Sequence, residues 1–295
     1  MPHKSELLLP AGSLVKLKTA VLYGADAVYA GTPDMCLRAQ SKISLEDLEE
    51  GIKFVHARGK KIYLTLNLFM HNRDVEKLPT FVDTLRRLKP DGVLIADPGV
   101  FQYVKDHAPE LNLFVSTQAN VCSSQAVKFW QRQGAKLCVL GREVTYDEMK
   151  EIREQCPDIL LECFMHGAMC MSYSGRCLLS NYMTGRDSNR GACAQPCRYE
   201  YALVEEKRPG EYFPVYEDEK GTYILNSRDL CMIDHLPELM AAGVDSFKIE
   251  GRAKSAYYAA IVTGAYRHCI DAAVRGEAPD PVWRDEVEHV SHRHY

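Results

Sequence analysis

The sequence predicts an α/β protein built on a closed (β/α)8 barrel, with a cysteine-rich insertion and a β-hairpin after the seventh strand. Short β-type runs alternate with amphipathic helical stretches through more than half of the 295 residues. Strands separated by helices form a parallel sheet, and eight such units in roughly 250 residues fit a TIM-like barrel better than an open sheet. No GxGxxG turn follows the first strand, so the main argument for an open dinucleotide-binding sheet is missing.

The predicted strands are short apolar runs bounded by polar or turn residues. They cover residues 6–9, 27–30, 61–67, 92–96, 113–117, 136–140, 159–165 and 246–250. The helical patterns between them carry apolar residues on one face, and several open with a Ser, Thr or Asp cap. They include residues 13–24, 44–59, 74–89, 124–134 and 145–156, and the pattern at 255–276 is expected to close the barrel.

The alternation of strand and helix patterns stops after the seventh strand. This break predicts four parts in the chain. Residues 1–166 hold seven β/α units, 167–231 the insertion, 232–276 the last unit and 277–295 a C-terminal tail. The insertion includes a predicted hairpin that turns at Glu219-Lys220-Gly221 and leaves the C-terminal rim of the barrel, where active sites are built. The tail is expected to be an exposed polar end, with a metal-binding tract at His289, His292 and His294 as the alternative.

The composition is typical of a globular protein, because the apolar content of 46% and the charged content of 26% are ordinary. The net charge of -4 gives no global reason to expect nucleic acid, although a local basic patch stays open. Neither a cleavage-site pattern nor an apolar stretch of membrane-spanning length occurs, so we expect no membrane partner and a cytoplasmic location. In a reducing compartment the 11 cysteines are thiols or metal ligands rather than disulfides.

Four cysteines within 28 residues predict a metal centre, formed by Cys170, Cys177, Cys193 and Cys197. Thiolates suit soft metals, so the four could hold either zinc or a 4Fe-4S cluster. The Cys-x6-Cys and Cys-x3-Cys spacings lack the paired CxxC knuckles of zinc ribbons, which favours iron–sulfur and leaves zinc as the alternative. Cys231 is a fifth candidate ligand.

Basic and amide side chains near the strand ends predict a substrate site at the same rim. Guanidinium groups bind carboxylates or phosphates in a bidentate manner, and a helix that begins after the last strand adds an anion site. The candidate substrate-binding residues are Arg176, Arg190, Arg198, Lys248, Asn67 and Gln118.

Three further residues are candidate catalytic groups: His166, Glu162 and Arg252. His166 ends the seventh strand beside the cysteines and could act as an acid or base, or hydrogen-bond a loop backbone. Glu162 points either into the barrel or toward a helix, because strand register is not fixed by one chain. A buried glutamate is usually paired, so Arg252 or Lys248 is its expected partner.

Several segments resemble the U32 (collagenase-like) peptidase family. They are residues 6–31, ECFMHGAMCMSYSGRCLLSNY at 162–182, GACAQPCR at 191–198, YILNSRDLC at 223–231 and SFKIEGRAKSAYY at 246–258. The likeness covers nearly the whole chain. Further segments are similar to one branch of this family, the prephenate-dependent tRNA uridine hydroxylases. They are GREVTYDEMKEIR, KFWQRQGAK and the terminal SHRHY.

This resemblance implies oxygen-independent hydroxylation of the tRNA wobble uridine to 5-hydroxyuridine, with prephenate as the hydroxyl donor and an iron–sulfur cluster. The cluster ligands would be Cys170, Cys177, Cys193 and Cys197, with Cys231 as the alternative fourth ligand. Relatives hydroxylate a ribosomal RNA cytidine or a ubiquinone precursor. Family members usually continue past the SHRHY segment into a small β domain, so the resemblance implies that this sequence is a short member or part of a longer one.

Two other classes of function stay open. The family name implies a peptidase, yet the sequence has no HExxH or GxSxG motif, and a thiol protease would have to pair a cysteine with His166 in space. The other class is a non-catalytic module in which a zinc-filled loop displays arginines to RNA. The sequence leaves the oligomeric state undetermined, with a homodimer as one option.

Overall fold

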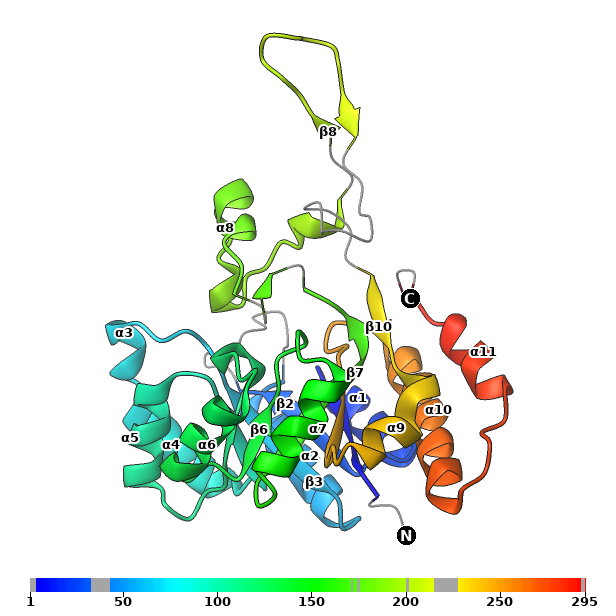
Figure 1. Ribbon diagram of the computed structural model, residues 1–295. Helices are drawn as coiled ribbons and strands as arrows, with labels where there is room; N and C mark the ends of the chain where they lie inside the picture. Colours follow the sequence, from blue (N-terminus) through cyan, green and yellow to red (C-terminus); the bar gives the residue numbers. More distant parts are fainter. Residues whose placement is uncertain are drawn as a thin grey trace.

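A computed structural model describes residues 4–32, 43–170, 172–173, 176–199, 202–214, 228–292 and 295 (Figure 1). Its centre is a closed barrel of parallel strands, which pair in the order β7-β11-β1-β2-β3-β4-β5-β6 and close through a β6–β7 pairing. The strands are β1 Glu6–Ala11, β2 Ala27–Gly31, β3 Lys61–Leu66, β4 Gly92–Ile95, β5 Leu113–Val115, β6 Leu137–Val139, β7 Leu160–Ala168 and β11 Ser246–Ile249. The predicted fold and each predicted strand are confirmed.

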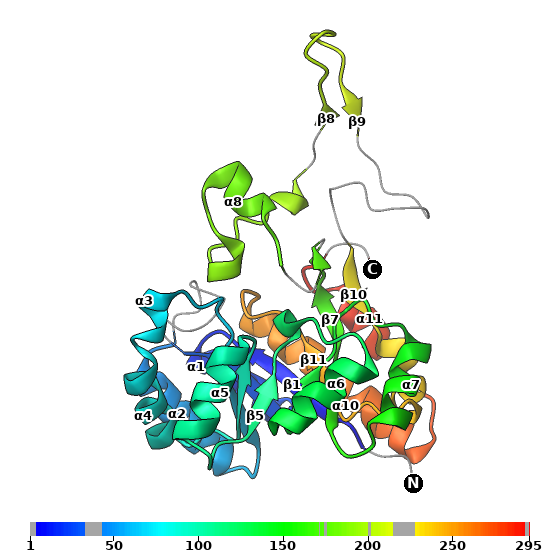
Figure 2. The same ribbon diagram turned by 60° about the vertical axis from the view of Figure 1, so that its left-hand side comes forward.

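Helices surround the barrel, as the two ribbon views show (Figures 1 and 2). They are α1 Leu14–Leu22, α2 Leu45–His56, α3 Asn72–Val75, α4 Leu78–Leu88, α5 Pro98–His107, α6 Ser124–Gln133, α7 Tyr146–Gln155, α9 Leu236–Ala241 and α10 Ala256–Arg275. Side chains of Ser13, Ser44, Asp97, Ser123 and Thr145 cap the helices that follow them.

One helix predicted from the sequence is two separate helices in the structure. The pattern at 74–89 is divided between α3 and α4, and α4 has Pro79 in its first turn. Proline fits the first turn of a helix but not its interior, because it lacks the N–H that the previous turn would bind. The single helix predicted there was wrong for this reason.

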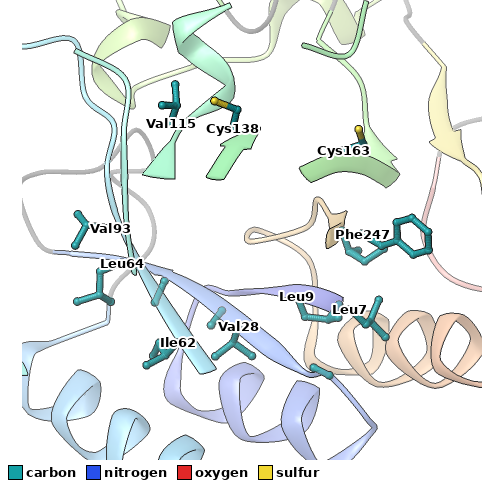
Figure 3. Close-up of a cluster of buried hydrophobic side chains, with 14 of the residues drawn as sticks. Leu7, Leu9, Val28, Ile62, Leu64, Val93, Val115, Cys138, Cys163 and Phe247 are labelled. Carbon is teal, nitrogen blue, oxygen red and sulfur yellow. The ribbon is translucent and has the colours of Figure 1, made fainter. Parts of the chain in front are cut away.

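The strand side chains form two apolar layers with a period of two residues. Inside the barrel lie Leu8, Tyr29, Tyr63, Leu94 and Phe114. The alternate positions face the helices, and Figure 3 shows part of this outer layer, including Leu7, Leu9, Val28, Ile62 and Leu64. Each such side chain that is fully buried contributes about 1.5–3 kcal/mol relative to an exposed one, so the barrel provides a rigid frame for its rim.

The insertion rises from the end of β7 and stands above the rim (Figures 1 and 2). It contains α8 Leu179–Thr184, the 3-10 turns Ser188–Arg190 and Pro196–Arg198, and a short antiparallel hairpin of β8 Ala202–Leu203 with β9 Phe213–Pro214. The chain returns through β10 Asp229–Cys231, which pairs antiparallel with β7, and a 3-10 turn, Ile233–His235. The turn predicted at Glu219-Lys220-Gly221 lies outside the described residues.

The C-terminal residues pack against the barrel. Helix α11 Val282–Glu288 lies beside α10, and Val287 and Val290 are buried. His292 stacks on Tyr295 with ring centroids 4.1 Å apart. The expected exposed polar end was therefore wrong, because these apolar side chains belong to the core; His294 lies outside the described residues.

No helix in the described part of the chain has both the length and the apolar character needed to cross a membrane.

Candidate active site

A cavity of about 140 Å³ lies where the barrel strands end and the insertion begins. Its walls include all four clustered cysteines, Cys170, Cys177, Cys193 and Cys197. The barrel contributes Asn67, Gln118, Lys248 and Arg252, and the insertion contributes Arg198. The strand ends and the insertion thus bring nine of the residues singled out from the sequence to one place.

The four thiols lie close enough to influence one another. Burial raises the pKa of the Cys197 thiol, and Cys170, Cys193 and Cys177 raise it further by charge repulsion while Arg198 lowers it. Such coupling requires the sulfur atoms to share one local environment. The insertion therefore folds its two cysteine pairs toward each other despite the 15 residues between Cys177 and Cys193.

Hydrogen bonds around Cys177 favour its thiolate. Burial raises the pKa of this thiol, but hydrogen bonds from Ser172 and from the backbone N–H groups at the start of α8 outweigh burial and leave the pKa lowered. Donors to sulfur stabilise the charged form. A second donor of this kind, the backbone N–H of Gln195, lies 3.3 Å from Cys193 Sγ.

Local turns fix the backbone that carries these thiols. Asn189 accepts a 3.2 Å hydrogen bond from the Cys177 N–H and donates a 3.1 Å bond to the Cys177 carbonyl. Asp187 caps the turn that holds Asn189, and the turn ends at Gly191, whose φ of 88° is in the region that glycine adopts most readily. The Asn and Gly residues between the cysteine pairs are thus structural supports.

The donor set fits a soft metal. Thiolates bind zinc or iron–sulfur clusters, and all four clustered cysteines line the same cavity. In the described ranges, no group of three His, Cys, Asp or Glu side chains is arranged to hold a metal ion.

Two cations from the eighth barrel strand and the loop after it form the floor of the cavity. Lys248 donates a 2.6 Å hydrogen bond to Glu162, and both side chains are almost fully buried. Burial lowers the pKa of Lys248 and raises that of Glu162, and their contact opposes both shifts. Arg252 or Lys248 was the expected partner of Glu162, and the structure shows the pairing with Lys248.

Arg252 is the second cation and has fewer partners in the protein. It is 7% exposed, and its Nη1 lies 3.4 Å from Thr65 Oγ1. Its Nε has no hydrogen-bond partner among the described residues. A buried guanidinium donor that the protein leaves unsatisfied in a cavity wall is suited to an anionic ligand.

Amide and hydroxyl groups form another side of the cavity. The Asn67 amide donates to Ser116 Oγ at 3.3 Å and to Gln118 Oε1 at 3.2 Å. Arg176 does not line the cavity, but its guanidinium donates to the Gln118 carbonyl at 2.9 Å and so supports this wall. These groups offer the donors and acceptors that a planar polar ligand, such as a base, requires.

Two predicted residues take part in structural ion pairs instead. Arg190 does not line the cavity, because it forms a bidentate pair with Asp74 of α3 at 2.8 and 3.0 Å. Glu162 is fully buried inside the barrel beneath Lys248 and does not reach the cavity surface. Direct substrate binding by Arg190 and direct catalysis by Glu162 do not fit these positions.

His166 lies on the outer side of the barrel and not in the cavity. A bulge in β7 after Phe164 pairs His166 with the outward-facing Ile249. Its ring lies 3.3 Å from the Tyr266 hydroxyl and 3.4 Å from the Tyr295 hydroxyl. Burial lowers the pKa of His166 to about 3. An acid–base role for His166 at the cavity does not fit this geometry, and no residue pattern in the seventh strand predicts the bulge.

Cys231 is separate from the four clustered thiols. It lies opposite His166 on β10, and its sulfur accepts a 2.9 Å hydrogen bond from Arg284 of α11. It does not line the cavity. Its position favours Cys170, Cys177, Cys193 and Cys197 as the set of thiols that act together.

Other cavity residues were not among the candidate site residues. Arg142 and Glu250 follow strands β6 and β11, and the Arg142 guanidinium lies 3.6 Å from the centre of the Phe164 ring. Tyr29 and Thr65 lie within strands, and the Tyr29 hydroxyl donates to Glu250 at 3.1 Å. Inward-facing polar residues in an apolar strand give no distinct signal in one sequence.

Comparison with known proteins assigns this barrel and its cysteine-rich rim to a family. The model of Peptidase family U32 matches residues 12–295, so the chain belongs to that family. Among solved structures, the U32 peptidase Mk0906 superposes with a TM-score of 0.55 at 17% identity, covering 85% of this chain and 95% of that one. That likeness concerns the fold.

Three relatives of higher sequence identity narrow the comparison. The tRNA hydroxylation protein P of Escherichia coli is 41% identical over 99% of this chain and 73% of its own length. The 23S rRNA 5-hydroxycytidine C2501 synthase of the same organism is 36% identical over 92% of this chain and 40% of its own length. An uncharacterised protease of Methanocaldococcus jannaschii is 42% identical over 98% of this chain and 71% of its own length.

Proposed function

We propose that this protein is an RNA hydroxylase that converts the wobble uridine of tRNA to 5-hydroxyuridine without molecular oxygen, with prephenate as the hydroxyl donor. The observation that carries the proposal is the meeting of four thiols with Lys248 and Arg252 around one cavity. Relatives named for hydroxylation of tRNA and of ribosomal RNA support the reaction class.

The proposed cofactor is a 4Fe-4S cluster held by Cys170, Cys177, Cys193 and Cys197. Four thiols around a cavity, with hydrogen-bond donors to two of the sulfurs, support a cluster over a single zinc ion. When bound, such a cluster would supply Lewis-acid or electron-transfer chemistry at the substrate.

The surrounding side chains would bind and orient the reactants. Lys248, Arg252 and Arg198 would bind the carboxylates of an anionic donor, because charge-assisted hydrogen bonds are strong in a partly buried site. Asn67 and Gln118 would bind the polar edge of the base. Both tRNA and small anions are available in the cytoplasm, which is the proposed location.

The first test is metal and nucleoside analysis. We expect about four iron and four sulfide per chain after oxygen-free purification, and loss of 5-hydroxyuridine-derived nucleosides from tRNA of cells that lack the protein. A Cys177→Ala variant should lose the cluster and fail to restore the nucleosides, whereas Cys269→Ala, a buried thiol of α10, should retain both.

Each part of the proposal has its own contradicting result. Zinc without sulfide would support the RNA-binding module and remove the redox enzyme. Unchanged tRNA nucleosides with iron and sulfide present would remove the tRNA assignment and leave the metal centre intact. Peptidase activity gains no support from the geometry, because His166 faces away from the four thiols.

A further inference from the structure

An exposed apolar face lies directly beside the cavity. Leu178 follows the cavity-lining Cys177 in the chain and is 75% exposed. Tyr182, one turn further along α8, is 90% exposed, and Met183 is 45% exposed. Residues four apart share one helix face, so Leu178 and Tyr182 present a contiguous apolar surface to solvent, which we call the α8 face. Leaving such large side chains in water is unfavourable unless a partner covers them.

The charge around the α8 face is positive. Residues 170–199 contain four arginines, one aspartate and no other charged side chain, although the whole chain carries a net charge of -4. The Arg190–Asp74 pair neutralises one of the four. Arg176 and Arg186 are exposed, and their guanidinium groups donate to the carbonyls of Gln118 and Ala192 instead of to a carboxylate.

We propose that the α8 face is a stacking platform for unpaired bases of an RNA loop, with Tyr182 stacking on a base that neighbours the one in the cavity. This inference rests on the proposed RNA substrate and specifies how it is held. Aromatic side chains stack on splayed, single-stranded bases, and nearby arginines bind the phosphates. A continuous duplex keeps its bases stacked on each other and offers no such contact.

The hairpin β8–β9 does not fit the same partner. It also projects above the rim (Figure 1), but its described residues include Glu205, Glu206 and Glu211 against Lys207 and Arg208. Arg208 is paired with Glu205 and Glu211. An RNA backbone would meet net negative charge there. Tyr212, which is 71% exposed on this hairpin, is therefore a matched control for Tyr182.

The test measures the affinity of the cluster-loaded protein for two labelled RNAs, an anticodon stem-loop and a blunt duplex. Loss of one stacked base weakens binding by about 5- to 150-fold. We expect that loss for the stem-loop with Tyr182→Ala, little change with Tyr182→Phe, and wild-type binding with Tyr212→Ala. The duplex should bind weakly to all variants alike. Thermal unfolding should be unchanged, because Tyr182 is 90% exposed.

Three results would overturn the inference. The first is wild-type stem-loop affinity in Tyr182→Ala. The second is an equal loss of stem-loop and duplex binding. The third is a dimer in sedimentation that Tyr182→Ala converts to a monomer while RNA affinity stays unchanged, which would make the α8 face a contact between two copies. A Tyr182-dependent stem-loop affinity in a protein that leaves tRNA unhydroxylated would keep this inference and remove only the proposed reaction.

Discussion

At the scale of single residues, Arg252 has a buried donor that lowers the stability of the folded protein and is available to a ligand. An unsatisfied buried donor costs about 1–3 kcal/mol, and Arg252 Nε is such a donor in the cavity wall. Among the described residues, the Arg252 side chain has a hydrogen-bond partner in the Thr65 hydroxyl, 3.4 Å from Nη1. An anion bound in the cavity would be able to satisfy the remaining guanidinium donors.

We therefore expect Arg252→Met to lower the affinity for an anionic co-substrate by about 10- to 100-fold, the value of one or two charge-assisted hydrogen bonds. Methionine keeps the apolar volume and removes the unsatisfied donor, so the free energy of unfolding should stay equal or rise. Urea unfolding and the KM for prephenate would measure the two effects. A large loss of stability with an unchanged KM would show that Arg252 is a structural residue.

The sequence predicted correctly those cavity residues whose position follows from nearby residues in the chain. The clustered cysteines and the polar strand ends, such as Asn67 and Lys248, reach the cavity. Arg190 and His166 did not, because a distant carboxylate and a strand bulge determine their positions. Tyr29 was missed since its role depends on which side of the strand faces inward.

At the scale of elements, the barrel and the position of the insertion were predictable, but the internal structure of the insertion was not. Strands and helices of the barrel follow from periodicity and caps that lie within a few residues of each other. The insertion has little periodicity, and long-range contacts hold it, such as the hydrogen bonds of Arg190 to Phe69 and Asp74. Its hairpin β8–β9 joins strands of only two residues each, which leave no pattern to detect.

The Asp74–Arg190 pair is expected to anchor the cysteine loop to α3. Hydrogen bonding to Arg190 lowers the pKa of Asp74 to about 2. A lowered carboxyl pKa contributes stability above its unfolded pKa of about 4, which is lost as the pH falls toward 2. Asp74→Asn should cost about 1–3 kcal/mol at pH 7 and increase hydrogen exchange in residues 186–192.

The same change at Asp83, an exposed residue of α4, is the control. It should leave exchange in the insertion unchanged. If Asp74→Asn protected residues 186–192 as well as the wild type does at pH 7, the pair would not be the anchor.

At the scale of the whole molecule, the C-terminal segment completes the outer layer beside β7. Helix α11 covers α10, and Tyr295 reaches the His166 ring that Tyr258 and Tyr266 also contact. The tail reads as polar in sequence because its two buried valines, Val287 and Val290, are separated by Glu288 and His289. Packing of the tail therefore connects the chain's end to the strand that carries the insertion.

This packing should make the protein sensitive to acid. Burial lowers the pKa of His166 to about 3, and Asp229 opposes this shift while His292, Lys254 and Arg284 add to it. His166 binds a proton near pH 6.5 in the unfolded chain but stays neutral at that pH in the folded protein. Its contribution to the free energy of unfolding is therefore complete above pH 6.5 and falls as the pH drops toward 3. At pH 5 the loss from this one group is about 2 kcal/mol.

A His166→Phe variant should lose about 2 kcal/mol less than the wild type between pH 7 and pH 5, because phenylalanine does not titrate. The hydroxyls of Tyr266 and Tyr295 keep acceptors in the carbonyls of Met165 and Val287, at 2.9 and 3.3 Å. Urea unfolding at both pH values would measure the difference, with His289→Phe as the exposed control. If His166→Phe and the wild type lost the same stability at pH 5, a group other than the buried His166 ring would cause the acid sensitivity.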